Sequence, residues 1–269
     1  MDLGLQGKVA IVSGASRGLG RAIAEGLAGE GARVVICART EEAVRATADE
    51  IARQARVVAA GGEVLPACAD VGRAADIDRL VGQTMERWGR VDILVTNAGG
   101  PPSGPAVGLT DGQWEAAVEG LLMSAVRLSR AVIPYMQQQR WGRILHVTSF
   151  TVKQPLASLA LSNAVRLAVV GLAKTQALEL APYNILVNTL CPGPIATDRL
   201  ADLTRQYAER DGITFEEAER RLWLSQIPLG RLGHPAEFAN LAVFLASERA
   251  SFITGGTFQV DGGAVRGPL

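Results

Sequence analysis

The sequence is poor in the residues that metal sites, disulfide scaffolds and nucleic-acid interfaces need. Its 269 residues include 3 cysteines and 2 histidines, and its 27 basic side chains balance 27 acidic ones. Because phosphate binding needs a clustered surplus of cations, zero net charge argues against a nucleic-acid partner. The cysteines and histidines lack ligand spacing, so no metal site is expected. No apolar run approaches ~20 residues and no charged leader precedes the first strand, so we expect a cytoplasmic protein without a membrane partner.

The few cysteines and histidines have packing roles in this interpretation. Cys37, Cys68 and Cys191 lie in or beside apolar, strand-like segments, so we expect three small buried hydrophobic side chains. His146 lies inside the strand-like segment ILHVTS, where we expect it to be a satisfied core residue. With one of only two histidines expected in the core, a Ser-His-Asp hydrolase is not favoured.

What the chain does have is a regular alternation of strand-like and helical segments. Short apolar runs such as KVAIVSG and RVVICA are each followed by an amphipathic stretch. This order predicts an α/β fold, a single doubly wound parallel seven-stranded sheet (Rossmann fold) flanked by helices on both faces. We expect one domain over residues 1–269, with long helices at about 41–60, 112–139 and 158–181. The segment at about 198–227 is a candidate substrate lid.

A glycine-rich turn, SGASRGLG at residues 13–20, follows the first strand-like segment. Its glycines let the backbone turn tightly and approach a pyrophosphate, and the helix that follows offers free N–H groups and a positive dipole end. The order of strand, turn and helix predicts a dinucleotide site formed by Gly14, Ser16, Arg17, Gly18, Leu19 and Gly20.

Together with later motifs, this turn resembles that of the short-chain dehydrogenase/reductase family, most closely its 3-oxoacyl-[acyl-carrier-protein] reductase-like branch. The segment TNAG at 96–99 resembles the family's NNAG signature, and CPGPIAT at 191–197 resembles its PGxIxT turn. The matching motifs cover nearly the full length of the chain. The resemblance implies a cofactor site that continues through Asp70, Val71, Asn97, Ala98, Gly99, Pro192, Gly193, Ile195 and Thr197.

Two arginines indicate which dinucleotide binds. Members of the family selective for NAD carry an acid at the end of the second strand, where it accepts hydrogen bonds from the ribose 2′-hydroxyl. This chain has Ala38 there, followed by Arg39, and it places Arg17 in the glycine turn. Guanidinium groups match phosphate geometry, so the sequence predicts NADP(H) rather than NAD(H).

The resemblance fails at the catalytic positions. The family has a Ser, a Tyr thirteen residues later and a Lys four beyond; counting from Ser149, those positions hold Ser162 and Arg166. The family's catalytic Asn aligns with Leu121. Arg166 lies one helical turn after Ser162, so it could still bond the nicotinamide ribose. A Ser hydroxyl is a much weaker acid than Tyr, which makes Lys153, in the loop after Ser149, the candidate proton donor.

Two classes of function remain open. The first is an oxidoreductase acting on a small-molecule carbonyl or alcohol, with Ser149 orienting the substrate. The second is a non-catalytic NADP(H)-binding sensor or subunit partner. The retained Ser149, the PGxIxT turn and the candidate lid favour the first. The helices at 112–139 and 158–181 are apolar on more than one face, which predicts a homotetramer, or at least a homodimer.

Overall fold

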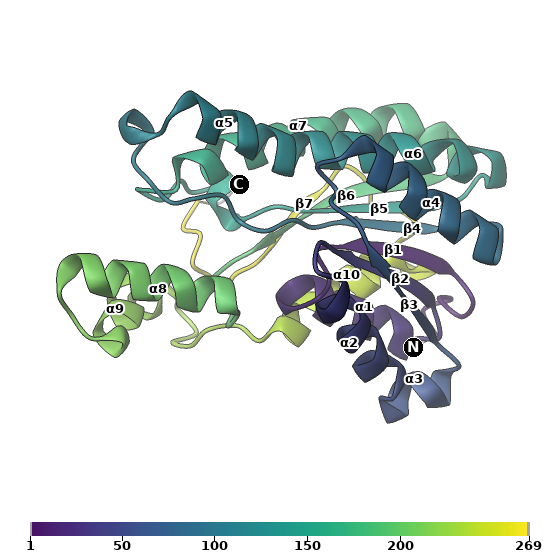
Figure 1. Cartoon of the computed structure of the whole chain (residues 1–269), viewed down its shortest axis with the longest axis horizontal. Helices are drawn as coiled ribbons and strands as arrows, with labels where there is room; N and C mark the ends of the chain where they lie inside the picture. The colour runs from purple at the N-terminus through teal and green to yellow at the C-terminus, as the bar shows by residue number, and fades with distance from the viewer. Residues whose placement is uncertain (1, 268–269) are drawn as a thin grey trace.

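The structure, a computed structural model, describes residues 2–267 and confirms the expected doubly wound sheet. Seven parallel strands lie in the order β3-β2-β1-β4-β5-β6-β7 (Figure 1). The strands are Val9–Ser13 (β1), Arg33–Ala38 (β2), Glu63–Cys68 (β3), Ile93–Thr96 (β4), Gly142–Val147 (β5), Ile185–Pro192 (β6) and Thr257–Val260 (β7). The strand order reverses between β1 and β4, and ligands of such sheets bind outside the carboxyl ends of the strands at that point.

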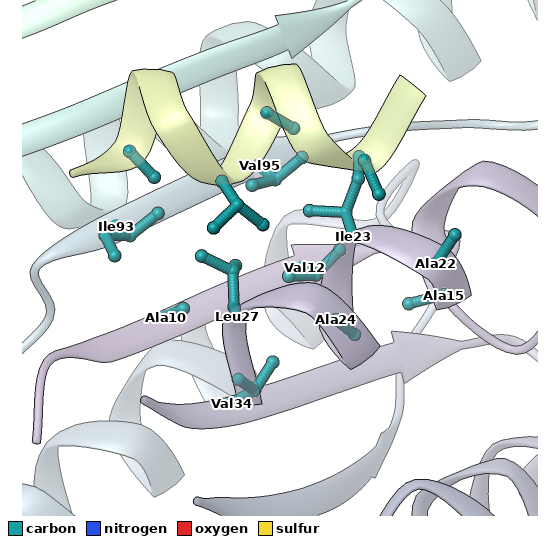
Figure 2. Packing of buried hydrophobic residues seen from close by; sticks show 14 of the residues in the cluster. Ala10, Val12, Ala15, Ala22, Ile23, Ala24, Leu27, Val34, Ile93 and Val95 are labelled. Carbon is teal, nitrogen blue, oxygen red and sulfur yellow. The ribbon is translucent and has the colours of Figure 1, made fainter. Parts of the chain in front are cut away.

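Helices cover both faces of the sheet, as Figure 1 shows. One face carries the helices Gly18–Gly29 (α1), Glu41–Ala52 (α2), Ala55–Ala60 (α3) and Pro235–Ala246 (α10). The other carries Ala74–Trp88 (α4), Ser124–Gln139 (α6) and Ala160–Leu180 (α7). In Figure 2, Ile23 and Leu27 of α1 lie among Val12, Ile93 and Val95 of the central strands. Two separate hydrophobic clusters, one on each face, therefore hold the sheet.

The prediction of one helix at 41–60 is wrong in one respect: the first helix, α2, ends at Ala52, and a second helix, α3, begins at Ala55. The backbone of Gln54 is extended, with φ −64° and ψ 131°. Its side-chain Nε2 donates a hydrogen bond to Glu25 Oε1 of α1 at 2.9 Å. In an unbroken helix, the face that buries Val44 and Ile51 would next turn Val58 inward. The break buries Val57 instead and leaves Val58 exposed.

The two other long helices occur close to their predicted bounds. The first runs from Asp111–Ala117 (α5) through a π-helical segment, Val118–Met123, into α6. The second, α7, begins at Ala160 rather than 158, because Ser158 has a φ of +62° that interrupts the helical backbone. The candidate lid contains Asp198–Asp211 (α8) and Phe215–Leu222 (α9), which project from the sheet (Figure 1).

The structure places the cysteines and His146 as follows. Cys37 and Cys191 are buried as predicted, but Cys68 is exposed. It ends the edge strand β3, where the residue before it, Ala67, faces the core. His146 is buried, and its Nδ1 lies 2.7 Å from the hydroxyl of Thr96. Its Nε2 lies 3.0 Å from Gln176 Oε1, and burial lowers the pKa of His146 to about 4.

Residues 2–267 form no helix that is both long enough and apolar enough to cross a membrane. Over the same range, no group of three or more His, Cys, Asp or Glu side chains is arranged to hold a metal ion.

Candidate active site

A cleft follows the carboxyl ends of the strands across the point where the strand order reverses. It comprises a larger cavity of about 670 Å³ beside β2 and β3 and a smaller one of about 400 Å³ beside β5 and β6. The segment from Asn97 to Pro101 lines both. Of the site residues predicted from the sequence, all except Gly20 and Lys153 line at least one of the two cavities.

Two glycines of the turn, Gly14 and Gly20, are packed too closely for a side chain, and Gly14 and Gly18 have backbone conformations that favour glycine. Gly14 and Gly18 have φ values of +59° and +58°. A Cβ on Gly14 would lie 2.7 Å from the carbonyl oxygen of Asn97, and one on Gly20 would lie 2.4 Å from the carbonyl oxygen of Gly14. Ser13 fixes the same contact, because its hydroxyl donates to Asn97 O at 2.8 Å and accepts from Asn97 N at 2.9 Å. Backbone N–H groups at the start of α1 are thereby left next to the cleft.

The larger cavity has the features expected of an adenosine site. Ser16, Asp70 and Val71 line it, and Ala38 at the end of β2 places no carboxylate there. Arg17 and Arg39 border both cavities. The position after β2 is therefore cationic, as a ribose 2′-phosphate would need.

The turn between β6 and α8 forms one wall of the smaller cavity, through Pro192, Gly193, Ile195 and Thr197. Gly193 passes so close to the chain after β7 that a Cβ would lie 2.4 Å from Asp261 Cα. The Thr197 hydroxyl accepts from Leu200 N at 3.4 Å and so caps α8. This cap directs the start of α8 toward the cleft.

Arg166 is buried beneath the smaller cavity and connects two strand ends. Its guanidinium donates to the carbonyls of Val147 at 3.2 Å, Thr148 at 3.0 Å and Ala98 at 3.4 Å. Burial lowers the pKa of Arg166 to about 10, and the positive charge of Arg199 adds to the lowering. Arg166 is still a cation at neutral pH, and it borders the space where a cofactor ribose would lie.

Ser149 and Ser162 lie in the same cavity as Arg166, so the structure brings these three predicted residues together. Ser149 Oγ accepts from the backbone N of Thr151 at 3.2 Å and from its hydroxyl at 3.0 Å. With both contacts made as an acceptor, the Ser149 hydroxyl keeps its own proton free to donate. Ser162 lies in the first turn of α7 and is half-buried.

Lys153 follows the short 3-10 helix Phe150–Val152, which Ser149 caps. Lys153 is half-buried, and it is not among the residues within 2–267 that line the smaller cavity. Burial raises the pKa of the Cys191 thiol, and the Thr148 hydroxyl and the charge of Lys153 partly oppose that rise. Its role as a proton donor stays a prediction.

Leu121 adds an apolar side chain to the wall of the larger cavity. It lies on the π-helical segment and is 7% exposed, in a cluster with Ala117, Leu161 and Val165. The family's Asn at this position completes a water relay, and Leu121 has no polar atom with which to hold a water.

Sequence reasoning missed Arg199, the second residue of α8. It is half-buried, lines the smaller cavity and donates to the Pro101 carbonyl at 2.6 Å. A Cβ on Gly100 would lie 2.6 Å from its Nε, so Arg199 lies directly against the segment that both cavities share. Arg199 could have been suspected because it lies two residues after the PGxIxT turn. The predicted lid, however, was only a range of residues and did not indicate which side chains face the cavity.

A parallel sheet with a tight glycine turn at its switch point and a cationic cleft along its carboxyl edge defines a Rossmann-type dinucleotide-binding protein. Residues 14–265 match the family described as enoyl-(acyl carrier protein) reductase. The chain is 37% identical over 261 residues to the 3-oxoacyl-[acyl-carrier-protein] reductase FabG of Escherichia coli (strain K12), which covers 97% of this chain and 98% of that relative. It therefore belongs to the short-chain dehydrogenase/reductase family, among relatives that are oxidoreductases.

Solved structures agree with this assignment. L-sorbose reductase from Gluconobacter frateurii, complexed with NADPH and L-sorbose, superposes with a TM-score of 0.92 at 34% identity, over 99% of this chain and 100% of that one. An actinorhodin polyketide ketoreductase with NADPH gives a TM-score of 0.90 at 35% identity, over 97% of this chain and 98% of that one. At these identities the likeness includes sequence as well as fold.

Proposed function

We propose that the protein is an NADP(H)-dependent oxidoreductase that acts on a carbonyl or alcohol without the Tyr and Lys of its family. The observation that carries this proposal is the smaller cavity, in which Ser149, Ser162 and Arg166 meet the glycine turn and the PGxIxT turn. The fit to a dinucleotide rests on the glycine turn: Gly14 and Gly18 line the smaller cavity, and the close packing of Gly14 and Gly20 against backbone carbonyls holds the start of α1, with its free N–H groups, beside that cavity. When bound, the cofactor supplies or accepts the hydride.

The residues of the chain bind and orient the cofactor in this proposal. Free N–H groups at the start of α1 bind the pyrophosphate, and Arg17 and Arg39 bind the 2′-phosphate. Arg17 now contacts Asp198 at 3.3 Å, but both side chains are largely exposed, and such a pair is weak enough to be exchanged for a phosphate. Arg166 keeps N–H groups beyond those used on the strand carbonyls and can donate them to the nicotinamide ribose.

Ser149 orients the substrate in this proposal. Because its oxygen accepts two hydrogen bonds from Thr151, its proton is available for a substrate carbonyl oxygen in the cavity. Ser162 lacks the acidity of a Tyr and is a ring shorter, so it does not supply the proton. Lys153, or water admitted to the cavity, is the proposed source.

Alanine variants test this division of roles. We expect Ser162→Ala to keep most of the activity, and Ser149→Ala and Lys153→Ala each to lose about tenfold or more in kcat/KM, a modest loss for a polar catalytic contact. Steady-state kinetics at saturating NADPH measures all three. A robust parental activity abolished by Ser162→Ala alone would show that the role assigned to this residue is wrong.

Arg39 determines the cofactor preference in this proposal. We expect the parent to bind NADPH more tightly than NADH, and Arg39→Asp to reverse that order by about tenfold or more. The substitution removes a cation from the 2′-phosphate and introduces an acceptor for the 2′-hydroxyl. Fluorescence titrations with both cofactors at one ionic strength provide the measurement. Arg45→Asp, on the exposed surface of α2, is the matched control; equal affinities of the parent for both cofactors would contradict the assignment.

The second candidate function is non-catalytic binding of NADP(H) by a sensor or subunit partner. The observation that favours it is the apolar cluster around Leu121, which replaces the family's water relay. NADPH oxidation and alcohol-dependent NADP⁺ reduction, measured over a diverse panel of carbonyls and alcohols beside a cofactor titration, separate the two. Tight cofactor binding without turnover on any member of the panel selects the binding protein.

We also propose that the protein assembles into a homodimer or homotetramer. Leu167 and Leu178 of α7 are 52% and 73% exposed, and Phe252 near β7 is fully exposed. Covering such side chains is the usual reason for apolar residues on an outer face. Sedimentation velocity at micromolar concentration is expected to show a dimer or tetramer, with Leu178→Glu shifting the distribution toward smaller species. A parent that sediments as a stable monomer excludes the assembly.

A further inference from the structure

Two guanidinium groups in the smaller cavity have no carboxylate partner. Arg166 donates only to backbone carbonyls, and Arg199 donates to the Pro101 carbonyl. Within residues 2–267 neither forms an ion pair, whereas Arg17 and Arg205 beside them do. A carbonyl carries only a partial negative charge, so both positive charges remain unneutralised.

The surroundings of these arginines make their positive charge costly. Burial lowers the pKa of Arg199, the charge of Asp202 partly opposes that lowering, and the charge of Arg199 in turn helps to lower the pKa of Arg166. Arg199 also occupies the second position of α8, where the helix dipole is positive and disfavours a cation. Two carboxylates border the same cavity, but Asp202 pairs with Arg205, and the Asp198 side chain is 66% exposed, so solvent screens it even where Arg17 leaves it for a phosphate. The cavity therefore retains excess positive charge where it meets the shared segment.

Part of the cavity wall is apolar. Phe150, Leu159, Leu200, Leu203 and Trp223 line the cavity. Trp223 is 4% exposed, and its indole N–H donates to the Thr204 hydroxyl at 2.9 Å, so this donor is already satisfied within the protein. The cavity of about 400 Å³ would also hold the nicotinamide end of the cofactor, and the space left beside it suits the reacting end of a small organic molecule.

From this combination we infer that Arg199, supported by the charge of Arg166, forms a carboxylate subsite, and that the substrate is a keto acid or hydroxy acid with a compact apolar body. A carboxylate that accepts charge-assisted hydrogen bonds from Arg199 also offsets the repulsion between the two guanidinium groups, while the N–H groups of Arg166 remain for the ribose. The planar fork of Arg199 suits a two-oxygen anion. The inference rests on the proposed function, because it names the substrate class for the same site.

Binding to the NADPH-loaded protein tests the subsite without relying on turnover. The probes are benzoylformate and its methyl ester, which share the ketone and the aromatic ring and differ in the negative charge. By calorimetry we expect the acid to bind at least tenfold more tightly than the ester. Arg199→Leu is expected to remove that difference, and Arg210→Leu, on the exposed far end of α8, to preserve it.

The outcomes are distinct. Equal affinities of the two probes, or no binding of benzoylformate, overturn the subsite. If Arg199→Leu weakens NADPH binding tenfold in the absence of any acid, the anion between the arginines is the cofactor's pyrophosphate, which also overturns it. Failure of the proposed function has another signature: benzoylformate binds in an Arg199-dependent manner, yet the loaded protein oxidises no NADPH with any keto acid or other carbonyl.

Discussion

Restoring the family's three catalytic side chains, as Leu121→Asn, Ser162→Tyr and Arg166→Lys, is expected to raise NADPH-dependent carbonyl reduction by about two orders of magnitude. A positioned general acid contributes roughly 10²–10⁴ in rate, and no Tyr is among the residues within 2–267 that line the cavity. Ser162 borders an open cavity, so a ring at this position has space to enter. Initial rates of NADPH oxidation on a carbonyl panel measure the gain.

The control is the same triple variant with Phe in place of Tyr at 162, because it adds the ring without the hydroxyl. Cofactor titration and circular dichroism establish that both variants fold and bind NADPH. A Tyr variant that binds NADPH yet reduces nothing that the parent does not would show that the pocket has been repurposed beyond its acid. That result would favour the binding protein.

The free energy of unfolding is expected to fall by about 3 kcal/mol between pH 6.5 and pH 4 because of His146 alone. Burial lowers the pKa of this imidazole from 6.5 to about 4. The unfolded chain therefore binds a proton in this window that the folded chain does not, and stability decreases as the pH falls. The full effect of a pKa that falls from 6.5 to about 4 is about 3.4 kcal/mol at ~1.36 kcal/mol for each pKa unit, and most of it is lost within this window.

Urea denaturation at half-unit pH intervals from 7.5 to 4 measures this dependence. His146→Gln removes the titrating group and is expected to flatten the curve in that window, even though it lowers stability at pH 7. His234→Gln, at the exposed second histidine, is the matched control. If the His146→Gln protein loses stability with the same slope as the parent, the protons are taken up elsewhere.

Local patterns were sufficient to predict the sheet and the cofactor turn. Each buried strand is a short apolar run, and the turn between β1 and α1 is a contiguous motif, so both depend on neighbours in the sequence. The structure adds the reason for the glycines: the carbonyl of Asn97, 83 residues after Gly14, leaves no space for a Cβ.

Features that depend on distant partners were not predictable in this way. The break after α2 depends on Glu25 of α1, which lies 29 residues before Gln54. Arg166 was expected to face a ribose, but most of its observed contacts are to strand carbonyls fixed by the tertiary fold. Periodicity likewise does not show that β3 lies at the sheet edge, which is what exposes Cys68.

The packing beneath α8 and α9 determines which parts of this protein can accept substitutions independently of the sheet. Phe150, Leu200, Trp223, Ile227 and Val265 form an apolar cluster that shares no buried residue with the two clusters holding the sheet. Energetic effects of substitutions in separate clusters add nearly independently. Selection or engineering can therefore redesign the walls of the smaller cavity, and with them the choice of substrate, while the cofactor-binding fold keeps its stability.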